Sequence, residues 1–366
     1  MKTFLVTILS LLTFGNLHSQ IEGSDKIYSE FLYEKVFSRF ECALEDSCAM
    51  SFKEAVFLVE NTYFNETLDR IQFEQQIHDL VVTVSSVVQA HNLIYEGNDY
   101  KEVEKYAAIF QVMCDTIAIN YGDTIINHLP FTYDFDDIWG YKQWSNMFVS
   151  KLLNTRKGNC HSMPLLYKIL ADQIGTEAHL AIAPNHFYIK QYSQKSGWFN
   201  TELTSASFPI DAWYMATGYI HLDGIVNKLY MEALSEKQSL VLCLIDLAKG
   251  YQQKFGSKDG EFIQKCIDLG LKHFPNYINA LLLKTEVLKV QFFEIMESNY
   301  AEYPKEVMHI PEAKSLFDEM ELLAKKIHKM GYRRMPREMY LDWLASLREE
   351  REKYTNKKIS NFKSRN

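Results

Sequence analysis

Residues 158–164 read Gly-Asn-Cys-His-Ser-Met-Pro, and the fold around them can be inferred outward from this stretch. Apolar residues follow at helical spacing, at Leu165, Leu166, Ile169, Leu170 and Ile174, before Gly175. The pattern predicts an amphipathic helix that begins beside Cys160. Asn159 is a typical N-cap residue, and Pro164 is tolerated in a first turn, where the backbone N–H groups have no intrahelical partner. A thiol there faces the positive end of the helix dipole, which lowers a cysteine pKa and suits a nucleophile.

Beyond this helix the sequence changes to short runs that are typical of strands. The runs are 178–183, 186–190 and 198–202, with a turn near Ser196 and Gly197. They predict a small antiparallel sheet packed on the helix that carries Cys160. His186 opens the second strand and Glu202 lies near the end of the third, so a hairpin makes them roughly cross-strand neighbours. A thiol nucleophile, an imidazole base and a carboxylate that orients the base would then meet.

Three motifs in this order resemble the transglutaminase-like core of the papain-type cysteine hydrolase superfamily. They are Lys157-Gly158-Asn159-Cys160, Pro184-Asn185-His186-Phe187-Tyr188 and Gly197-Trp198-Phe199-Asn200-Thr201-Glu202-Leu203-Thr204. The resemblance covers about residues 131–211 and implies that Cys160 is the nucleophile and His186 its general base. The family usually has Asp where Glu202 stands, and Asn200, two residues earlier on the same strand face, is the alternative third member.

The resemblance implies amide or thioester-type acyl transfer without a cofactor, acting on a peptide or protein substrate. Hydrolysis is favoured over crosslinking because many exported bacterial-type members of the family look like peptidases or amidases. The backbone N–H of Cys160 would bind the oxyanion. Gln143, upstream of the cysteine, is the candidate side-chain donor to the same oxyanion, whereas Trp144 is assigned to core packing.

Metal-site alternatives fit this sequence poorly. A zinc site of Cys160, His161 and His186 lacks the Cys-x-x-Cys or His-x-x-x-His pair that would supply further ligands. His161 is instead assigned to the surface or to a position behind the nucleophile. The acidic loop at 134–137 lacks the Gly and the distal Glu of a calcium loop, so we interpret it as a solvated rim.

Composition limits the remaining classes of function. The chain has 366 residues, 47% hydrophobic and 14% aromatic, which is enough to bury a sizeable core and excludes disordered and low-complexity classes. Lys and Arg total 39 against 47 Asp and Glu, a net charge of -8, so nucleic acid is not an expected partner. With 15 Gly and 8 Pro, we expect long helices and limited loop.

The N-terminus is typical of a secretory signal peptide at 1–19, with Lys2, a short apolar stretch at 4–14 and a small or polar end. A buried N-terminal helix is the alternative. We expect an exported protein, periplasmic or secreted, without an integral membrane segment in the mature chain. Thiols can oxidise outside the cytosol, so Cys42 and Cys48 are candidates for a local disulfide. Three others, Cys114, Cys243 and Cys266, lie in apolar helical patterns and are assigned to the core as free thiols.

The whole pattern predicts a mostly helical α+β fold in five regions. These are the signal peptide at 1–19, a helical region at 20–129, the transglutaminase-like core at 130–217, a tetratricopeptide-like helical region at 218–345, and a charged terminal helix and tail at 346–366. Within the first helical region, the Val-rich run at 81–88 also fits a strand. Residues 266–282 resemble a junction of tetratricopeptide helices, whose concave face would bind a protein partner, with plain helical packing as the alternative. A non-catalytic peptide- or protein-binding module that retains the fold is the alternative to an enzyme.

Overall fold

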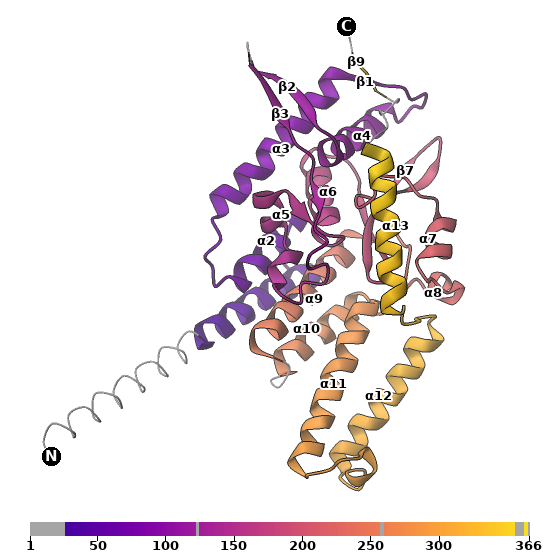
Figure 1. The fold of residues 1–366 in the computed structure, drawn as a ribbon. Coiled ribbons are helices and arrows are strands. Elements are labelled where there is room, and N and C mark those ends of the chain that lie inside the picture. The colour runs from indigo at the N-terminus through magenta and orange to yellow at the C-terminus, as the bar shows by residue number, and fades with distance from the viewer. Residues whose placement is uncertain (1–25, 122–123, 257–259, 356–361, 365–366) are drawn as a thin grey trace, which may run out of the picture.

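The computed structural model describes residues 26–121, 124–256, 260–355 and 362–364 (Figure 1). The proposed signal peptide at 1–19 lies outside these residues. Helices predominate and the sheets are small, so the fold is mostly helical α+β, as the sequence predicts. Among the described helices, none combines the length and the apolar character needed to cross a membrane.

Helices form most of the N-terminal region. They cover residues 26–44, α2 (Phe52–Tyr63), α3 (Arg70–Ala90) and α4 (Tyr100–Cys114). Ser51 caps α2 by accepting a hydrogen bond from the backbone N–H of Glu54. The Val-rich run at 81–88 is helical, because its buried residues continue the 3.6-residue spacing of α3, so the strand interpretation is wrong.

The region is not helical as far as residue 129. β2 (Ile117–Tyr121) and β3 (Thr124–His128) form an antiparallel hairpin, and β1 (His91–Leu93) pairs with β9 (Phe362–Ser364) from the other end of the chain. The β-branched residues of the hairpin favour a strand. His128 anchors it by a 2.7 Å hydrogen bond from Nε2 to the Val112 carbonyl in α4.

The central sheet has the order that the sequence predicts. β6 (His179–Ala183), β7 (His186–Ser193) and β8 (Gly197–Thr201) are antiparallel neighbours in that order. Asn185 turns the chain between the first two strands with a φ of 57°, which asparagine tolerates better than most residues. α6 (Ser162–Gln173) packs against β7 and is almost wholly buried, and Gly175 follows it with a φ of 65°.

The C-terminal half consists of helices. They are α7 (Asp211–Thr217), α8 (Leu222–Val226), α9 (Glu236–Phe255), α10 (Gly260–His273), α11 (Ile278–Ser298), α12 (Pro311–Lys329) and α13 (Arg337–Thr355). From α9 to α12 each helix packs on the next, and α11 and α12 project away from the sheet (Figure 1).

The last helix does not respect the boundary that the sequence suggests between residues 345 and 346. α13 runs across this boundary and packs back on the core beside β7 (Figure 1). Its side chains at 340, 343, 344 and 347 are buried, which is the spacing of one helix face. The charged residues of α13 therefore lie mostly on its outer face.

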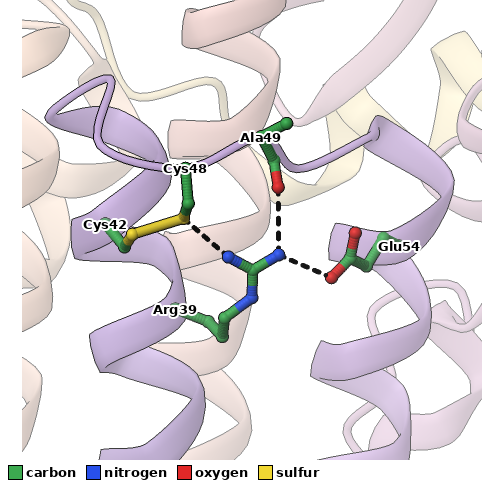
Figure 2. Close-up of a disulfide and its surroundings, with 5 residues drawn as sticks. All are labelled: Arg39, Cys42, Cys48, Ala49 and Glu54. Carbon is green, nitrogen blue, oxygen red and sulfur yellow. Dashed lines mark hydrogen bonds and ion pairs between the residues drawn. A yellow bond between two sulfur atoms is a disulfide. The ribbon is translucent and has the colours of Figure 1, made fainter.

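Cys42 and Cys48 form a disulfide (Figure 2). The Arg39 guanidinium lies against it, with Nη1 2.6 Å from the Cys48 sulfur, and Nη2 donates to the Ala49 carbonyl at 3.0 Å and to the Glu54 carboxylate at 2.9 Å. These contacts tie the end of the first helix to the beginning of α2. Burial raises the pKa of three free thiols above the ordinary value, those of Cys114, Cys243 and Cys266.

Candidate active site

The start of α6 holds the candidate nucleophile. Cys160 lies on the short connection between β5 (Lys157–Gly158) and α6. The side-chain oxygen of Asn159 accepts hydrogen bonds from the backbone N–H groups of His161 at 3.0 Å and Ser162 at 3.1 Å, so Asn159 caps this helix start. The Cys160 thiol is therefore held near the positive end of the helix dipole.

The buried pair of His186 and Glu202 lies beside this thiol. His186 Nε2 is 2.6 Å from Glu202 Oε2, and both side chains are at most 1% exposed. The same carboxylate oxygen accepts a 2.6 Å hydrogen bond from the Tyr214 hydroxyl, and Oε1 accepts one from the backbone N–H of Thr204 at 2.8 Å. Three donors therefore fix the carboxylate in place.

The register of β7 and β8 explains how His186 and Glu202 meet. Ile189 is paired with Thr201, so Glu202 lies one residue beyond the last pair. His186 lies further along β7, and the contact is a diagonal one across the sheet, in keeping with the rough cross-strand proximity expected from the sequence. Glu202 is held beyond the strand by a backbone bridge with Ser207.

Asn200 is not in contact with the imidazole. Its side-chain amide donates to the Pro209 carbonyl at 2.9 Å and to Asp211 Oδ1 at 2.8 Å. These bonds fasten the segment that precedes α7. Of the two candidates for the third position, the structure therefore places Glu202, and not Asn200, on the His186 ring.

One ring nitrogen of His186, Nδ1, is available to the Cys160 thiol. Nε2 is bonded to Glu202, and Nδ1 is buried without a well-formed hydrogen bond to any described residue. The imidazole is near enough to the Cys160 thiol to lower the pKa of the thiol, and the thiol in turn raises the pKa of His186. The Cys160 sulfur also lies 3.8 Å from the Asn185 carbonyl oxygen and 3.9 Å from the Tyr340 hydroxyl.

The electrostatics favour a charged pair at Cys160 and His186. Burial alone would raise the pKa of the Cys160 thiol, but hydrogen bonding and charge from His186 outweigh it and lower that pKa. Burial would lower the pKa of His186, yet Glu202 and Cys160 raise it to about 10. Burial opposes ionisation of Glu202 too, and His186 overcomes it and lowers the carboxyl pKa. The combination favours a thiolate, an imidazolium and a carboxylate together.

Tyr133 approaches the thiol from another element. β4 (Thr132–Tyr133) pairs in parallel with β5, and Tyr133 lies opposite Gly158. A Cβ on Gly158 would lie 2.7 Å from the Ser162 hydroxyl and from a Leu152 methyl carbon, so a larger residue here would displace both side chains. The Tyr133 hydroxyl adjoins both the thiol and the backbone N–H of Cys160, but makes no well-formed hydrogen bond within the described residues. Burial raises its pKa well above the ordinary value, so it remains a proton donor.

Gln143 does not reach the thiol. It precedes the short helix η1 (Trp144–Met147) and is exposed. Its backbone N–H donates to Asp137 Oδ2 at 3.0 Å, and its side chain makes no hydrogen bond to any described residue. The acidic loop has a structural role instead of forming only a solvated rim, because Asp137 organises the start of η1 and Asp134 pairs with Lys151 at 2.6 Å.

His161 is buried rather than on the surface. Nδ1 is 3.0 Å from the Met147 carbonyl oxygen, and Nε2 is 2.8 Å from Asp246 Oδ2 on α9. Both partners are acceptors, so both ring nitrogens must carry protons. Burial would lower the pKa of His161, but Asp246 more than compensates and raises it. The ion pair joins the start of α6 to the C-terminal helices.

Two aromatic side chains of α13 complete the site, and neither is among the site residues that the sequence predicts. The Tyr340 hydroxyl donates to the Asn185 carbonyl at 3.1 Å, and the Trp343 ring lies 4.7 Å from the His186 ring, centroid to centroid. Cys160 is 6% exposed and His186 3%. The apolar stripe at 340, 343, 344 and 347 predicts a buried helix face, but nothing local in the sequence identifies the surface that it covers.

No protein-family model and no curated protein matches this sequence. A solved structure of menin, described as revealing the binding site for Mixed Lineage Leukemia (MLL) protein, aligns with 80% of this chain and 70% of its own. The identity is 12% and the TM-score is 0.36. A likeness at this level carries no argument about the fold or the function of this chain.

Proposed function

We propose that this protein is a thiol-dependent acyl-transfer enzyme of the transglutaminase-like type that hydrolyses an amide or peptide bond. The observation that carries the proposal is the position of the His186 imidazole, with Nε2 on Glu202 and Nδ1 free to serve the Cys160 thiol. The cap on α6 and the lowered thiol pKa support the nucleophilic role of Cys160.

In the proposed reaction the Cys160 thiolate attacks the substrate carbonyl carbon, and a carbon–sulfur bond forms as the carbonyl becomes an oxyanion. The oxyanion accepts hydrogen bonds from the backbone N–H of Cys160 and from the Tyr133 hydroxyl, which replaces Gln143 as the side-chain donor. The His186 imidazolium gives its Nδ1 proton to the leaving amine as the carbon–nitrogen bond breaks. An acyl-enzyme thioester and a neutral imidazole remain.

Water completes the proposed reaction. The neutral His186 accepts a proton from a water molecule, whose oxygen attacks the thioester carbon. The carbon–sulfur bond then breaks and returns the thiolate, the imidazolium and a carboxylic acid product. Glu202 holds the ring in this orientation and stabilises its positive charge, and Tyr214 holds Glu202. Tyr214 is thus a positioning residue.

The compartment forms part of the proposal. We infer export, with a mature N-terminus near Gln20, from the signal-like sequence at 1–19. The disulfide between Cys42 and Cys48 is compatible with an oxidising environment. Mass spectrometry of the mature protein tests this inference, because an intact Met1 on cytosolic protein would contradict it.

A specific observation favours the second candidate, a non-catalytic binding module. Tyr340 and Trp343 cover the thiol and the imidazole, and an enzyme needs its nucleophile accessible. On this alternative α13 covers the thiol permanently, and a protein partner would bind the face formed by α9 to α12. The reactivity of the thiol separates the two candidates.

The deciding experiment is alkylation of the full chain by iodoacetamide at neutral pH, with labelled sites identified by mass spectrometry. We expect Cys160 to react faster than Cys243 and Cys266, and His186→Ala to slow its reaction at least about tenfold. His179→Ala is the matched control, because His179 lies on the neighbouring strand and bonds the Leu234 carbonyl instead. Equal rates in wild type and His186→Ala would favour the binding module.

A further inference from the structure

We propose that α13 is a lid whose closed position blocks Cys160, and that substrate reaches the thiol only when α13 moves away from β7. The biological purpose of the lid rests on the proposed function. Its closure, in contrast, limits the access of any reagent to the Cys160 thiol and can be measured without a substrate.

The side chains of α13 fill the space where a substrate carbonyl would have to lie. The Tyr340 hydroxyl is 3.9 Å from the Cys160 sulfur and bonds the Asn185 carbonyl, and Trp343 stands edge-on to the His186 ring. Tyr340 is 1% exposed and Trp343 4%. With both rings in place the Cys160 sulfur is almost wholly covered, and protein interiors are packed too closely to admit a peptide bond there.

The catalytic pair does not need α13 for its own assembly. Cys160 is positioned by Asn159 and the start of α6, whereas His186 is positioned by β7 and Glu202. Of the α13 side chains beside the pair, the Trp343 indole N–H donates to the Thr217 hydroxyl at 3.2 Å, whereas the Tyr340 hydroxyl lies 3.9 Å from the Cys160 sulfur. Movement of α13 would therefore remove the Tyr340 contact, leave the supports from α6, β7 and Glu202 in place and expose the thiol.

The attachment of α13 suits a movable element. A stretch without helix, residues 332–336, joins it to α12. Gly331 precedes this stretch with a φ of 99° and is packed so closely on the Gly224 backbone that a Cβ would not fit, so this end is fixed. Between this end and the pairing of β9 with β1, α13 is one continuous helix that would move as a unit.

Arg351 anchors the other end of α13. Its Nη2 donates to the Cys114 carbonyl, the last residue of α4, at 2.8 Å. This contact lies two helical turns beyond Trp343, so its removal loosens α13 without altering the site. Lys353 offers a matched control on the same helix, because its ion pair with Glu350 lies within α13.

The test measures the rate at which iodoacetamide labels Cys160 in the full chain, as wild type, Arg351→Ala, Lys353→Ala and Trp343→Ala. We expect Arg351→Ala to label at least about fivefold faster than wild type, and Trp343→Ala faster again, with Lys353→Ala unchanged. Circular dichroism and a thermal melt establish that each variant is folded. If Trp343→Ala does not fold, Arg351→Ala alone decides.

Two results would overturn the lid. One is that folded Arg351→Ala labels Cys160 at the same rate as wild type, which would show that α13 does not move to admit the reagent. The other is equal acceleration by Lys353→Ala, which would show general loosening. Adding His186→Ala to Arg351→Ala keeps the two proposals apart: a fast rate that does not need His186 would leave the lid standing and contradict the catalytic pair.

Discussion

The Trp343 indole meets the His186 imidazole edge-on, with the ring planes at 89° and the centroids 4.7 Å apart. Because the indole keeps water from the imidazole, the ring and Glu202 interact in a medium of low dielectric constant, where opposite charges attract more strongly. Movement of α13 would admit substrate and water together. The proposed lid would thus set both the access to Cys160 and the strength of the charge pair.

The first prediction separates Glu202 from Asn200. We expect Glu202→Gln to lower the alkylation rate of Cys160 at neutral pH, and turnover once a substrate is known, at least about a hundredfold. Gln can hold the ring only as a dipole and does not stabilise the imidazolium. Asn200→Ala should leave both rates within about threefold of wild type and cost about 1 kcal/mol of stability, because it loses hydrogen bonds to Pro209 and Asp211.

Tyr214→Phe provides an intermediate case. It removes one donor from Glu202 and leaves the carboxylate in place. A rate between those of wild type and Glu202→Gln is expected. If Asn200→Ala were the severe variant and Glu202→Gln the mild one, the assignment of the third position would be reversed.

Local patterns in the sequence were sufficient to predict the core of the site. Asn159 and the apolar spacing after Cys160 predict the helix start, and the turn at Gly197 predicts the hairpin that brings Glu202 toward His186. Each of these inferences needs only neighbouring residues. The order of the three motifs suggests the thiol chemistry that we propose.

The rest of the site depends on contacts between distant segments. Tyr340 and Trp343 lie far along the chain from Cys160, and their helical spacing says that they are buried without saying against what. Tyr133 reaches the thiol through a two-residue parallel pairing that is too short for a sequence pattern to reveal. The place of Gln143 before the cysteine predicts an oxyanion donor, but the loop held by Asp137 leaves its side chain in solvent.

The second prediction concerns the pH dependence of the thiol. The pKa of Cys160 is lowered and that of His186 is raised to about 10, so the thiolate–imidazolium pair should persist across neutral pH. An ordinary thiol reacts about tenfold more slowly for each pH unit below its pKa near 8.5. We expect the alkylation rate of Cys160 to rise less steeply between about pH 7 and pH 9 than the rate of an ordinary thiol.

The comparison for this profile is His186→Ala measured in the same buffers. Without the imidazolium, burial is the largest remaining influence, and the pKa of the thiol should rise. Its rate should then climb steeply over the same range. A steep climb in the wild type as well would mean that the pair is neutral in the native protein.

The third prediction concerns the disulfide. The bond between Cys42 and Cys48 closes a short loop, with a sequence separation of 6, and joins the contacts of Arg39 (Figure 2). We expect the Cys42→Ser, Cys48→Ser double variant to lose about 2 kcal/mol of unfolding free energy, since a short loop restricts the unfolded chain only modestly. Denaturant unfolding with and without dithiothreitol checks this: reductant should lower the wild-type midpoint to that of the variant, which itself should not respond. A wild-type midpoint indifferent to reductant would mean that the thiols are not joined.

The last prediction uses the buried ion pair of His161 and Asp246. The folded-state pKa of His161 is raised above its ordinary value of 6.5, mainly by Asp246 acting against burial. The pair therefore contributes its full stability below about pH 6.5 and loses it as the pH rises through the raised folded-state value. We expect Asp246→Asn to cost about 3 kcal/mol of unfolding free energy on the acidic side of neutrality and progressively less at alkaline pH.

Asp223→Asn is the matched control, because its partner His221 is 45% exposed and such a pair is worth less than about 1 kcal/mol. Urea unfolding of both variants over a pH series measures the difference, and a cost of Asp246→Asn that grows with pH would show that His161 is neutral in the folded protein.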